Sequence, residues 1–378
     1  MKTRVFDKIE QIPEKLWEDI RQNQSVARSV TLSHAFWKVI EASQLSDFSY
    51  RYLVTYDASD KPVGIMTAYV VTTDIAIFAP PWLKDLLEKI RRWRPNFFKW
   101  KMLECGTPIN INSPAWSCLE SFKDQARDEL LSAAQQLAKQ ERVLVTVVRD
   151  FDPTAQAEQQ RMRERKFAMV DGLPNAILNL PWHSMDAYLK SLKSYYRSKL
   201  LKHVRRCEQA GMTYEVTNKF SELAQILSDQ WLLVHNNAKE YQREVLTPAF
   251  YAALSDTTNV DARVILVYQE GAIVAHALLL LDGELARWMY FGRNTVRNNG
   301  LYLFTAYAVI ESAINASASS LELGVTNYQT KLDLGASIVP LKFAINVWNS
   351  RYNRIAGRVY NMLNSVPLPT QRDVFKEK

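Results

Sequence analysis

The sequence predicts a mixed α/β protein made of two tandem domains of similar topology. Its 378 residues are enough for two ordinary domains of roughly 100–200 residues each. Hydrophobic spacings of the helical and strand types alternate along the chain, and one succession of helices, hairpin, strand, long helix and strand occurs twice. The repeat restarts near Pro181-Trp182, so we expect an N-terminal domain over 1–182 and a C-terminal domain over 183–378.

The first half begins with helices over 9–46, where apolar residues recur at helical spacing. Two strand-like runs, 50–56 and 62–73, flank a polar turn and predict a hairpin. The elements expected after the hairpin are a short strand over 101–105, a helix over 118–140, a strand over 142–148, a helix over 156–166 and a strand over 176–180.

The second half repeats this order. One long helix is expected over 185–209, with Gly211 as its natural stop, and a second hairpin is expected to turn at Glu270-Gly271. The other elements expected are helices over 220–236, 248–255 and 301–315, strands over 262–268, 272–281, 285–292, 320–324 and 341–348, a polar turn over 325–331 and a tail after about residue 366.

The composition excludes several classes of protein. Only 11 Gly and 14 Pro are too few for a fibrous or low-complexity chain, and 47% hydrophobic residues argue against wholesale disorder. Cys105, Cys118 and Cys207 are too sparse for a disulfide framework, and no Cys/His cluster has zinc-ligand spacing. We therefore expect reduced thiols and no metal.

Targeting signals are also missing from the pattern. The N-terminal residues are charged throughout, unlike a signal peptide. The longest apolar stretch, 262–281, is interrupted by Arg263 and Glu270, which argues against a membrane span. These features predict a cytoplasmic protein without a transmembrane segment.

The net charge of +7 comes from 47 Lys and Arg against 40 Asp and Glu, and much of it falls in two segments. The first, 84–101, interleaves cations with Trp82, Trp93, Phe97, Phe98 and Trp100. Such a mixture suits stacking on bases or docking at a membrane interface, and it suits a wedge between domains equally well.

The second basic segment is the helix expected over 188–207. Its cations are Lys190, Lys193, Arg197, Lys199, Lys202, Arg205 and Arg206. Its apolar stripe is Leu189, Leu192, Tyr196, Leu200 and Val204. One face therefore packs and the others are cationic, which suits a polyanion such as tRNA, a nucleotide-linked substrate or an anionic lipid. The alternative is a solvated face whose acidic partners come from elsewhere in the fold.

Four segments of the second half carry a family resemblance. They are YLKSLKSYYRSKLLKHVRRCEQAG at Tyr188–Gly211, GAIVAHALLLL at Gly271–Leu281, Tyr290-Phe291-Gly292 followed by 300–314, and ELGVTNYQTKLDLG at Glu322–Gly335. In this order they resemble the acyltransferases with two GCN5-related N-acyltransferase (GNAT) domains in tandem. That group is related to Fem-type aminoacyltransferases and to an acyltransferase domain found near biotin-synthesis-like genes. The resemblance covers residues 175–350 by motif and the first half by topology, and it implies a bacterial enzyme.

The resemblance implies a phosphate-binding loop at 297–302. The fold's pyrophosphate signature, Arg/Gln-x-x-Gly-x-Gly/Ala, corresponds here to Arg297-Asn298-Asn299-Gly300-Leu301-Tyr302, with Tyr in place of the last small residue. A helix N-terminus suits a pyrophosphate, although a glycine turn before a helix is also common. The candidate donor-binding residues are Arg297, Asn299, Gly300, Leu301, Tyr302 and Lys331.

The candidate catalytic residues are Glu322 and Tyr328. Glu322 lies between two leucines expected in the core, so it is expected to point the other way and to deprotonate an attacking amine. Tyr328 is expected to protonate or position the leaving group, and Lys331 to bind a phosphate or carboxylate. The alternative is a structural ion pair between Glu322 and Lys331, with Tyr328 packed on it.

Further contacts are implied by the same resemblance. A backbone N–H near Met289–Phe291 is expected to polarise the acyl carbonyl. The candidate substrate-binding residues are Tyr290, Arg293, Arg197 and Tyr241. His276 is expected to be a core histidine.

The resemblance therefore implies an N-acyltransferase in which a small-molecule amine attacks an activated acyl carbon directly. Acyl-CoA is the expected donor, with its phosphates on the 297–302 loop. An aminoacyl-tRNA donor is the first alternative, because of Tyr302 and the basic helix. A non-catalytic tandem module that binds RNA, another polyanion or a membrane is the second.

Overall fold

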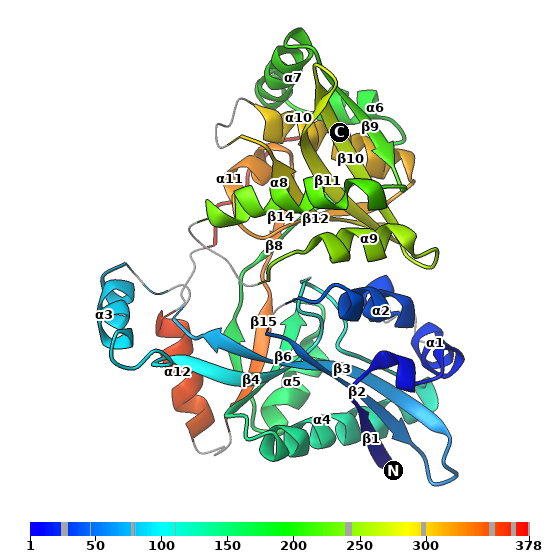
Figure 1. Ribbon diagram of the computed structural model, residues 1–378, viewed down its shortest axis with the longest axis vertical. Helices are drawn as coiled ribbons and strands as arrows, with labels where there is room; N and C mark the ends of the chain where they lie inside the picture. The colour runs from blue at the N-terminus through cyan, green and yellow to red at the C-terminus, as the bar shows by residue number, and fades with distance from the viewer. Residues whose placement is uncertain are drawn as a thin grey trace. The chain divides into compact units, whose positions relative to one another are not determined.

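The computed structural model describes residues 1–23, 29–45, 47–76, 79, 81–109, 111–238, 244–295, 300–347, 352–363 and 368–376 (Figure 1). The chain forms two compact units, each built around its own mixed sheet. Unit 1 consists of Met1–Glu41, Ser46–Leu173 and Pro340–Pro367, and unit 2 of Ala42–Leu45, Pro174–Val339 and Leu368–Lys378.

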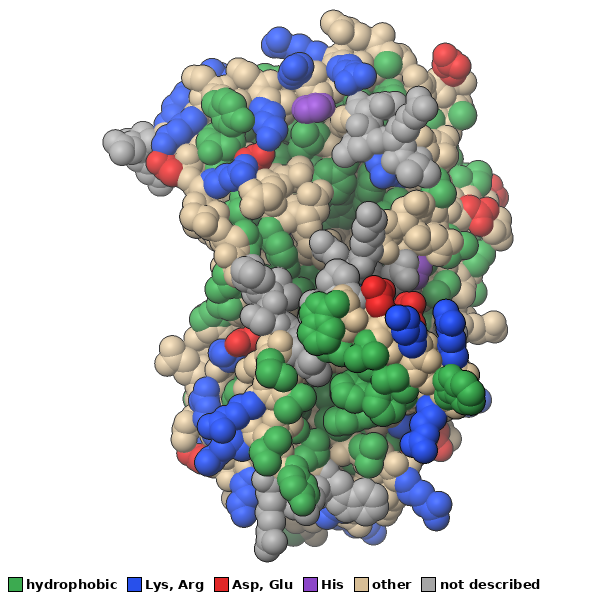
Figure 2. All heavy atoms as spheres, turned by 90° about the vertical axis from the view of Figure 1, so that its left-hand side faces the viewer, with side chains coloured by type: hydrophobic (Ala, Val, Ile, Leu, Met, Phe, Trp, Pro, Cys, Tyr) green, Lys and Arg blue, Asp and Glu red, His purple; other side chains and the backbone are tan. Residues whose placement is uncertain are grey.

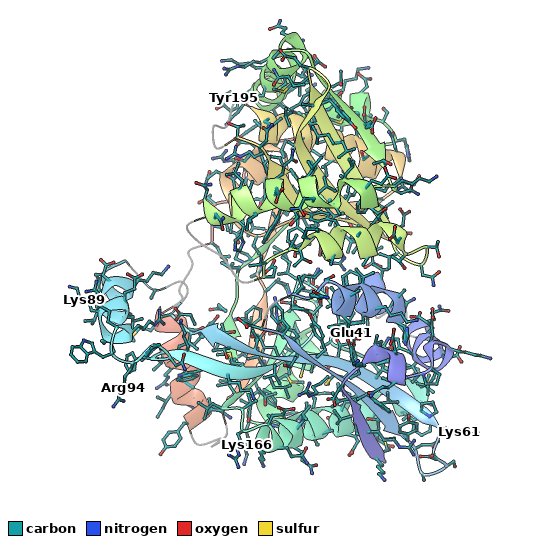
Figure 3. All side chains as sticks on the ribbon, in the orientation of Figure 1. Glu41, Lys61, Lys89, Arg94, Lys166 and Tyr195 are labelled. Atoms are coloured by element: carbon teal, nitrogen blue, oxygen red, sulfur yellow. The ribbon has the colours of Figure 1, made fainter. Side chains whose placement is uncertain are left out.

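The sheet of unit 1 has the strand order β1-β2-β3-β4-β6-β15-β7, with β5 paired to β3. Its strands are β1 (Lys2–Phe6), β2 (Ser49–Tyr56), β3 (Pro62–Asp74), β4 (Lys99–Cys105), β5 (Trp116–Cys118), β6 (Val145–Phe151), β7 (Ala168–Asp171) and β15 (Lys342–Val347). Its helices are α1 (Glu14–Gln22), α2 (His34–Ala42), α3 (Pro81–Arg91), α4 (Lys123–Gln140), α5 (Gln156–Glu164) and α12 (Asn353–Leu363). The apolar face of α4 packs on the central strands. The β2–β3 hairpin turns at Lys61 (Figure 3).

The sheet of unit 2 has the order β14-β8-β13-β12-β11-β10-β9. Its strands are β8 (Asn175–Asn179), β9 (Met212–Thr217), β10 (Asp261–Gln269), β11 (Ala272–Asp282), β12 (Leu285–Arg293), β13 (Ser320–Gly324) and β14 (Ser337–Val339). Its helices are α6 (Met185–Ser191), α7 (Ser194–Gln209), α8 (Ala224–Asn236), α9 (Pro248–Asp256), α10 (Leu301–Asn315) and α11 (Tyr328–Asp333). The expected turn of the β10–β11 hairpin is present, since Glu270 and Gly271 both have positive φ, at 52° and 77°.

The units do not coincide with the ranges 1–182 and 183–378 that the sequence predicts. Strand β8 belongs to unit 2, where it pairs with β13, although it precedes residue 182. Strand β15 belongs to unit 1, where it pairs with β6, although it follows every other strand in the chain. The sheet of unit 1 thus takes β15 from beyond the contiguous segment that forms most of it, whereas all strands of unit 2 lie within Pro174–Val339. Pairing depends on an available strand edge and not on sequence order.

Two predicted helices have different bounds. The helix expected over 185–209 is broken into α6 and α7, because the Lys193 N–H donates to the Val374 carbonyl at 2.9 Å and Leu192 bridges to Phe375. The helix expected from residue 118 begins at Lys123, because β5 pairs with β3 and keeps the chain before it extended. Strands β1, β5, β7, β9 and β14 and helices α3 and α12 are not among the predicted elements, and the turn expected over 325–331 contains the start of α11.

The expected tail is instead part of the core of unit 2. Val374 is buried, and the Phe375 ring lies 5.1 Å from that of Trp182. A side chain at Gly335 would collide with the Phe375 ring, since a Cβ there would lie 2.2 Å from it. Among the described residues, none of the helices is long and apolar enough to cross a membrane.

The docked C-terminal segment predicts a stability effect. Phe375→Ala is expected to lower the free energy of unfolding by about 2 kcal/mol, because it removes a ring that packs on the core of unit 2. Urea denaturation measures the change. Lys376→Ala is the matched control, with an expected change within about 0.5 kcal/mol because its side chain contributes to no cluster. Equal stabilities of the two variants would contradict the docking.

Candidate active site

The parallel strands β12 and β13 separate near the centre of unit 2. They pair only at Leu285–Ser320, Ala286–Leu321 and Arg287–Glu322. Beyond that point β12 continues along β11 to Arg293, while β13 continues along β8 to Gly324. We call this divergence the fork. Past Glu322 the two strands no longer pair with each other, so their facing backbone groups need other partners.

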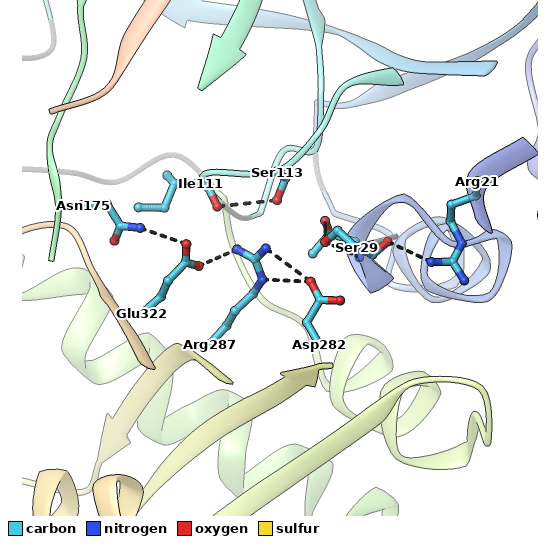
Figure 4. Close-up of polar contacts among 9 residues, drawn as sticks. Arg21, Ser29, Ile111, Ser113, Asn175, Asp282, Arg287 and Glu322 are labelled. Atoms are coloured by element: carbon cyan, nitrogen blue, oxygen red, sulfur yellow. Dashed lines mark hydrogen bonds and ion pairs between the residues drawn. The ribbon is translucent and has the colours of Figure 1, made fainter. Parts of the chain in front are cut away.

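A buried charge network holds the fork (Figure 4). Arg287 forms an ion pair with Glu322, its partner in the last paired register, and another with Asp282 at 3.3 Å. Asn175 Nδ2 donates to Glu322 Oε1 at 3.0 Å. Arg287 and Glu322 are each only 3% exposed, so each charge needs the other to offset the loss of its hydration.

Glu322 points away from the leucine core, as expected, but its ion-pair partner differs from the one considered for it. That partner is Arg287 on the adjacent strand, whereas the Lys331 Nζ donates to the Val325 carbonyl at 2.6 Å. The reason is register, since Arg287 lies directly across from Glu322 and Lys331 lies on α11. The role of Glu322 as a base stays a prediction beside this structural role.

Lys331 and Tyr328 lie together on α11. Burial lowers the pKa of the Lys331 ammonium to about 7. The Tyr328 hydroxyl donates to the Pro174 carbonyl at 2.8 Å, and the Tyr328 ring centre lies 6.0 Å from Lys331 Nζ. The anion-binding role of Lys331 and the acid role of Tyr328 also stay predictions.

A β-bulge lies at Met289, two residues past Arg287, the last residue of β12 that pairs with β13. Leu278 pairs with Tyr290 and Leu279 with Trp288, so Met289 has no partner on β11. Its other neighbour, β13, has already diverged. A bulge next to a strand divergence turns backbone groups out of the ladder, which makes this N–H the candidate donor to an acyl carbonyl.

The two faces of β12 beyond the fork carry aromatic side chains. Tyr290 packs edge-on against Trp231 and Phe250, and its hydroxyl donates to Glu244 Oε1 at 3.1 Å. On the other face Trp288 stacks on Tyr302, with ring centres 5.1 Å apart. Tyr302 is thus a packing residue on the strand, where a small residue would leave the strand face open.

Gly300 begins α10 in a conformation that only glycine adopts comfortably. Its φ is 89°, and a Cβ there would lie 2.7 Å from His203 Nδ1 on α7. Burial lowers the pKa of His203, as do Lys202, Arg206 and Lys199 around it. Its Nδ1 has no hydrogen-bond partner among the residues that the structure describes. A neutral ring with an unused nitrogen therefore borders the α10 N-terminus.

The structure describes only some of the remaining candidate binding residues. Arg297, Asn299 and Tyr241 lie outside the described residues. Arg293, half-buried, follows Phe291 by two residues and so lies on the same face of β12 as Tyr302. Burial lowers the pKa of Arg293, and within the described ranges no carboxylate pairs with it. It is the strongest candidate anion ligand that the structure places near α10.

The basic helix supports both of its interpretations. Lys190, Lys193 and Lys199 pair with Asp186, Asp373 and Asp333, so part of the charge is neutralised within unit 2. The cations of α7 without an acidic partner in the described part of the chain are Arg197, Lys202, Arg205 and Arg206. Only this second set is available to a polyanion.

A polar cluster in unit 1 was missed by sequence reasoning. The Tyr69 hydroxyl donates to Glu104 Oε2 at 2.8 Å, and Arg149 Nη1 donates to that hydroxyl and to the Thr107 carbonyl, each at 3.0 Å. Burial raises the pKa of the adjacent Asp150. Glu104 lies on β4, and Arg149 lies on the parallel strand β6, one residue past its last pair with β4. Charged residues within apolar strand runs were the signal that could have found them.

Replacing Glu322 tests the charge network. Glu322→Gln is expected to lower the free energy of unfolding by about 3 kcal/mol, because it leaves the buried Arg287 short of a counter-charge. Urea denaturation measures it, with the exposed Glu222→Gln as the matched control. Unchanged stability would contradict the network. Turnover of Glu322→Gln equal to that of the wild type across pH would separately exclude Glu322 as the base.

The burial of His276 predicts how the stability of the protein depends on pH. It is fully buried between Gln230 and Tyr251, and burial lowers its pKa to about 3 from an ordinary value near 6.5. The unfolded chain then binds the extra proton below pH 6.5, so stability is lost as pH falls from about 6.5 towards 3, by at most about 1.4 kcal/mol per pH unit. Urea midpoints across this range should fall less steeply in His276→Gln. An equal slope in both proteins would contradict the assignment.

Comparison with solved structures supports the tandem fold. FemX aligns with a TM-score of 0.58 at 11% identity, over 94% of this chain and 100% of that one. L-PGS from Bacillus licheniformis aligns with a TM-score of 0.54 at 11% identity, over 94% and 98%. A tandem GNAT protein from the clavulanic acid biosynthesis pathway aligns with a TM-score of 0.51 at 12% identity, over 92% and 98%.

Sequence comparison gives the family. A Mycobacterium tuberculosis chain with the provisional name 8-amino-7-oxononanoate synthase 2 is 26% identical over 359 residues. This match covers 92% of the present chain and 46% of the relative, so the chain spans about half the length of the curated relative it matches. The FemAB-like family model, described as peptidoglycan biosynthesis/recognition, matches residues 8–340. The chain therefore belongs to the FemAB-like family and has the fold of the tandem GNAT proteins.

Proposed function

We propose that unit 2 transfers an acyl group directly to an amine at the fork between β12 and β13. The observation that carries this proposal is the bulge at Met289, which leaves this residue without a register partner on β11 or β13 where the strands diverge. The acyl oxygen accepts from this N–H while the amine nitrogen attacks the carbonyl carbon. A C–N bond forms, the bond to the donor's sulfur or oxygen breaks, and a proton passes from the amine to the leaving atom or to a base.

The proposed donor is an acyl-CoA. The N-terminus of α10 offers unpaired N–H groups and a partial positive charge to a pyrophosphate, and Gly300 brings His203 against that terminus. Arg293, on the α10 side of β12, supplies a guanidinium for a phosphate oxygen. Arg297 and Asn299 are proposed to complete this phosphate site.

Aminoacyl-tRNA is the second candidate donor, and two observations favour it. The Tyr302 ring stacks on Trp288 and fills strand surface that a small residue would leave to the arm of coenzyme A. The cations of α7 without an acidic partner among the described residues lie on a helix that contacts α10 and provide a surface for a longer polyanion. The family description and the likeness to FemX agree with an amine acceptor of the kind used in peptidoglycan building.

One experiment separates these donors. The purified protein is incubated with acetyl-CoA, longer acyl-CoAs and aminoacyl-tRNA in separate reactions with amine acceptors, and mass spectrometry detects the amide product or the released donor. Amide or released thiol with an acyl-CoA supports the proposal, and product with aminoacyl-tRNA alone supports the second candidate. Neither product nor donor binding would overturn both and leave a non-catalytic module.

Arg293→Ala tests the phosphate site. It is expected to raise the KM for the donor about tenfold, equivalent to about 1.4 kcal/mol, with little change in kcat, because the guanidinium holds the donor before and during transfer. Steady-state kinetics measure both constants, and Lys219→Ala, an exposed cation of unit 2, is the control. A fall in kcat at unchanged KM would contradict this placement.

Arg205→Glu distinguishes the donors without disturbing the fork. Arg205 is exposed on α7 and has no ion-pair partner in the described segments. Activity with a tRNA-linked donor is expected to fall at least about fivefold and to become more sensitive to salt, while activity with an acyl-CoA stays unchanged. A loss with acyl-CoA would contradict the assignment of this face to the longer polyanion.

A further inference from the structure

Unit 1 exposes two apolar stripes on helices α3 and α12. On the α3 segment, Trp82 is 67%, Leu86 47% and Trp93 89% exposed. On α12, Ile355 is 57% and Met362 73% exposed, with Val359 between them. Residues at spacings of three and four share one helix face. Trp82 and Leu86 of α3 and Ile355, Val359 and Met362 of α12 therefore form outward apolar stripes, and the exposed Trp93 lies just past the end of α3.

The two stripes belong to one surface because the helices share an apolar base. The inner face of α3 packs through Leu83 and Leu87 onto Phe97 and Phe98. The inner face of α12 packs through Ala356 and Tyr360 into a cluster that also contains Phe98. Figure 2, which views unit 1 from the side of these helices, shows apolar side chains gathered there and bordered by Lys and Arg. We call this surface the α3–α12 surface.

The α3–α12 surface is strongly cationic. Residues 81–101 contain seven Lys and Arg against Asp85 and Glu88, and residues 352–363 add Arg354 and Arg358 without an acid. Arg91 is neutralised by Asp74 at 2.8 Å and Lys101 approaches Glu141 at 3.9 Å. The rest extend outward, as Lys89 and Arg94 do in Figure 3.

We propose that the α3–α12 surface docks onto an anionic lipid bilayer. Tryptophan prefers the membrane interface, aliphatic side chains enter the acyl region below it, and Lys and Arg pair with the headgroups. Helices of this length lie in the plane of the interface and do not span it.

Two other occupants fit the surface less well. RNA would engage the cations and stack on Trp82 and Trp93, but it gives Leu86, Ile355 and Met362 nothing to contact. A second copy of this chain would bring two surfaces of the same charge together, which is unfavourable. The bilayer alone uses the aromatic, aliphatic and cationic side chains at once.

Vesicle flotation tests the proposal on the full chain. Vesicles of phosphatidylcholine with phosphatidylglycerol should carry the protein to the top of the gradient, and vesicles of phosphatidylcholine alone should bind it at least about tenfold less. Trp93→Ser combined with Met362→Ser should reduce binding to the anionic vesicles by at least about tenfold. Val5→Ser is the control, since Val5 is 41% exposed on β1, at the opposite edge of the sheet.

Charge-reversal variants isolate the contribution of the cationic side chains to headgroup binding. Arg354→Glu with Arg358→Glu should abolish the preference for phosphatidylglycerol and most of its salt dependence, while Lys61→Glu at the hairpin tip should bind as the wild type does. Urea denaturation of each variant shows that the loss is not unfolding.

Three results would overturn the proposal. The first is that the wild type does not bind anionic vesicles. The second is that the Trp93→Ser, Met362→Ser variant binds them as well as the wild type does. The third is that the wild type binds RNA but no vesicles, and that this RNA binding is lost in the same variant. A dimer in light scattering that the same variant dissociates, without vesicle binding, would assign the surface to a second copy. Vesicle binding needs no turnover, so the proposal stands or falls independently of acyl transfer.

Discussion

The ion pair between Arg287 and Glu322 sets the point at which β12 and β13 separate. It lies at the last paired position of the two strands and is buried with Asp282 and Asn175. Burying two charges costs hydration that their attraction only partly offsets, so the pair specifies geometry more than it adds stability. Everything proposed for catalysis lies just beyond it: the Met289 bulge, the aromatic faces of β12 and the start of α10. If the strands continued in register past Glu322, the Met289 backbone would face a partner strand and not a substrate.

Unit 1 repeats this arrangement with different side chains. Its parallel pair, β4 and β6, also carries a buried acid on one strand and a buried arginine on the other, but Tyr69 lies between Glu104 and Arg149. Both parallel strand pairs thus carry buried charge, with different partners in the two units. In unit 2 the buried charges are accompanied by a bulge two residues past the last pair of β12 with β13 and by a helix that begins at a glycine.

The excess of Lys and Arg in the chain lies on two distinct surfaces. On α6 and α7 the acids Asp186, Asp333 and Asp373 neutralise three lysines, which leaves a limited cationic face next to the α10 terminus. On the α3–α12 surface few acids compensate the cations, and exposed Trp and aliphatic side chains accompany them. The first pattern suits a phosphate-bearing donor, and the second suits a lipid interface, so one excess of Lys and Arg serves two different surfaces.

By itself the sequence determined what depends on local pattern: the α/β class, the two hairpins, the glycine at the start of α10, and the family through motifs between Tyr188 and Gly335. These follow from hydrophobic spacing and turn chemistry, which act over a few residues. Tertiary structure decided the rest. Contacts between residues far apart in the chain placed β8 in unit 2 and β15 in unit 1, broke the helix at Leu192-Lys193, docked Phe375 and made Arg287 the partner of Glu322. No local pattern encodes such contacts, because a strand edge or a buried charge is satisfied by whichever group the fold brings to it.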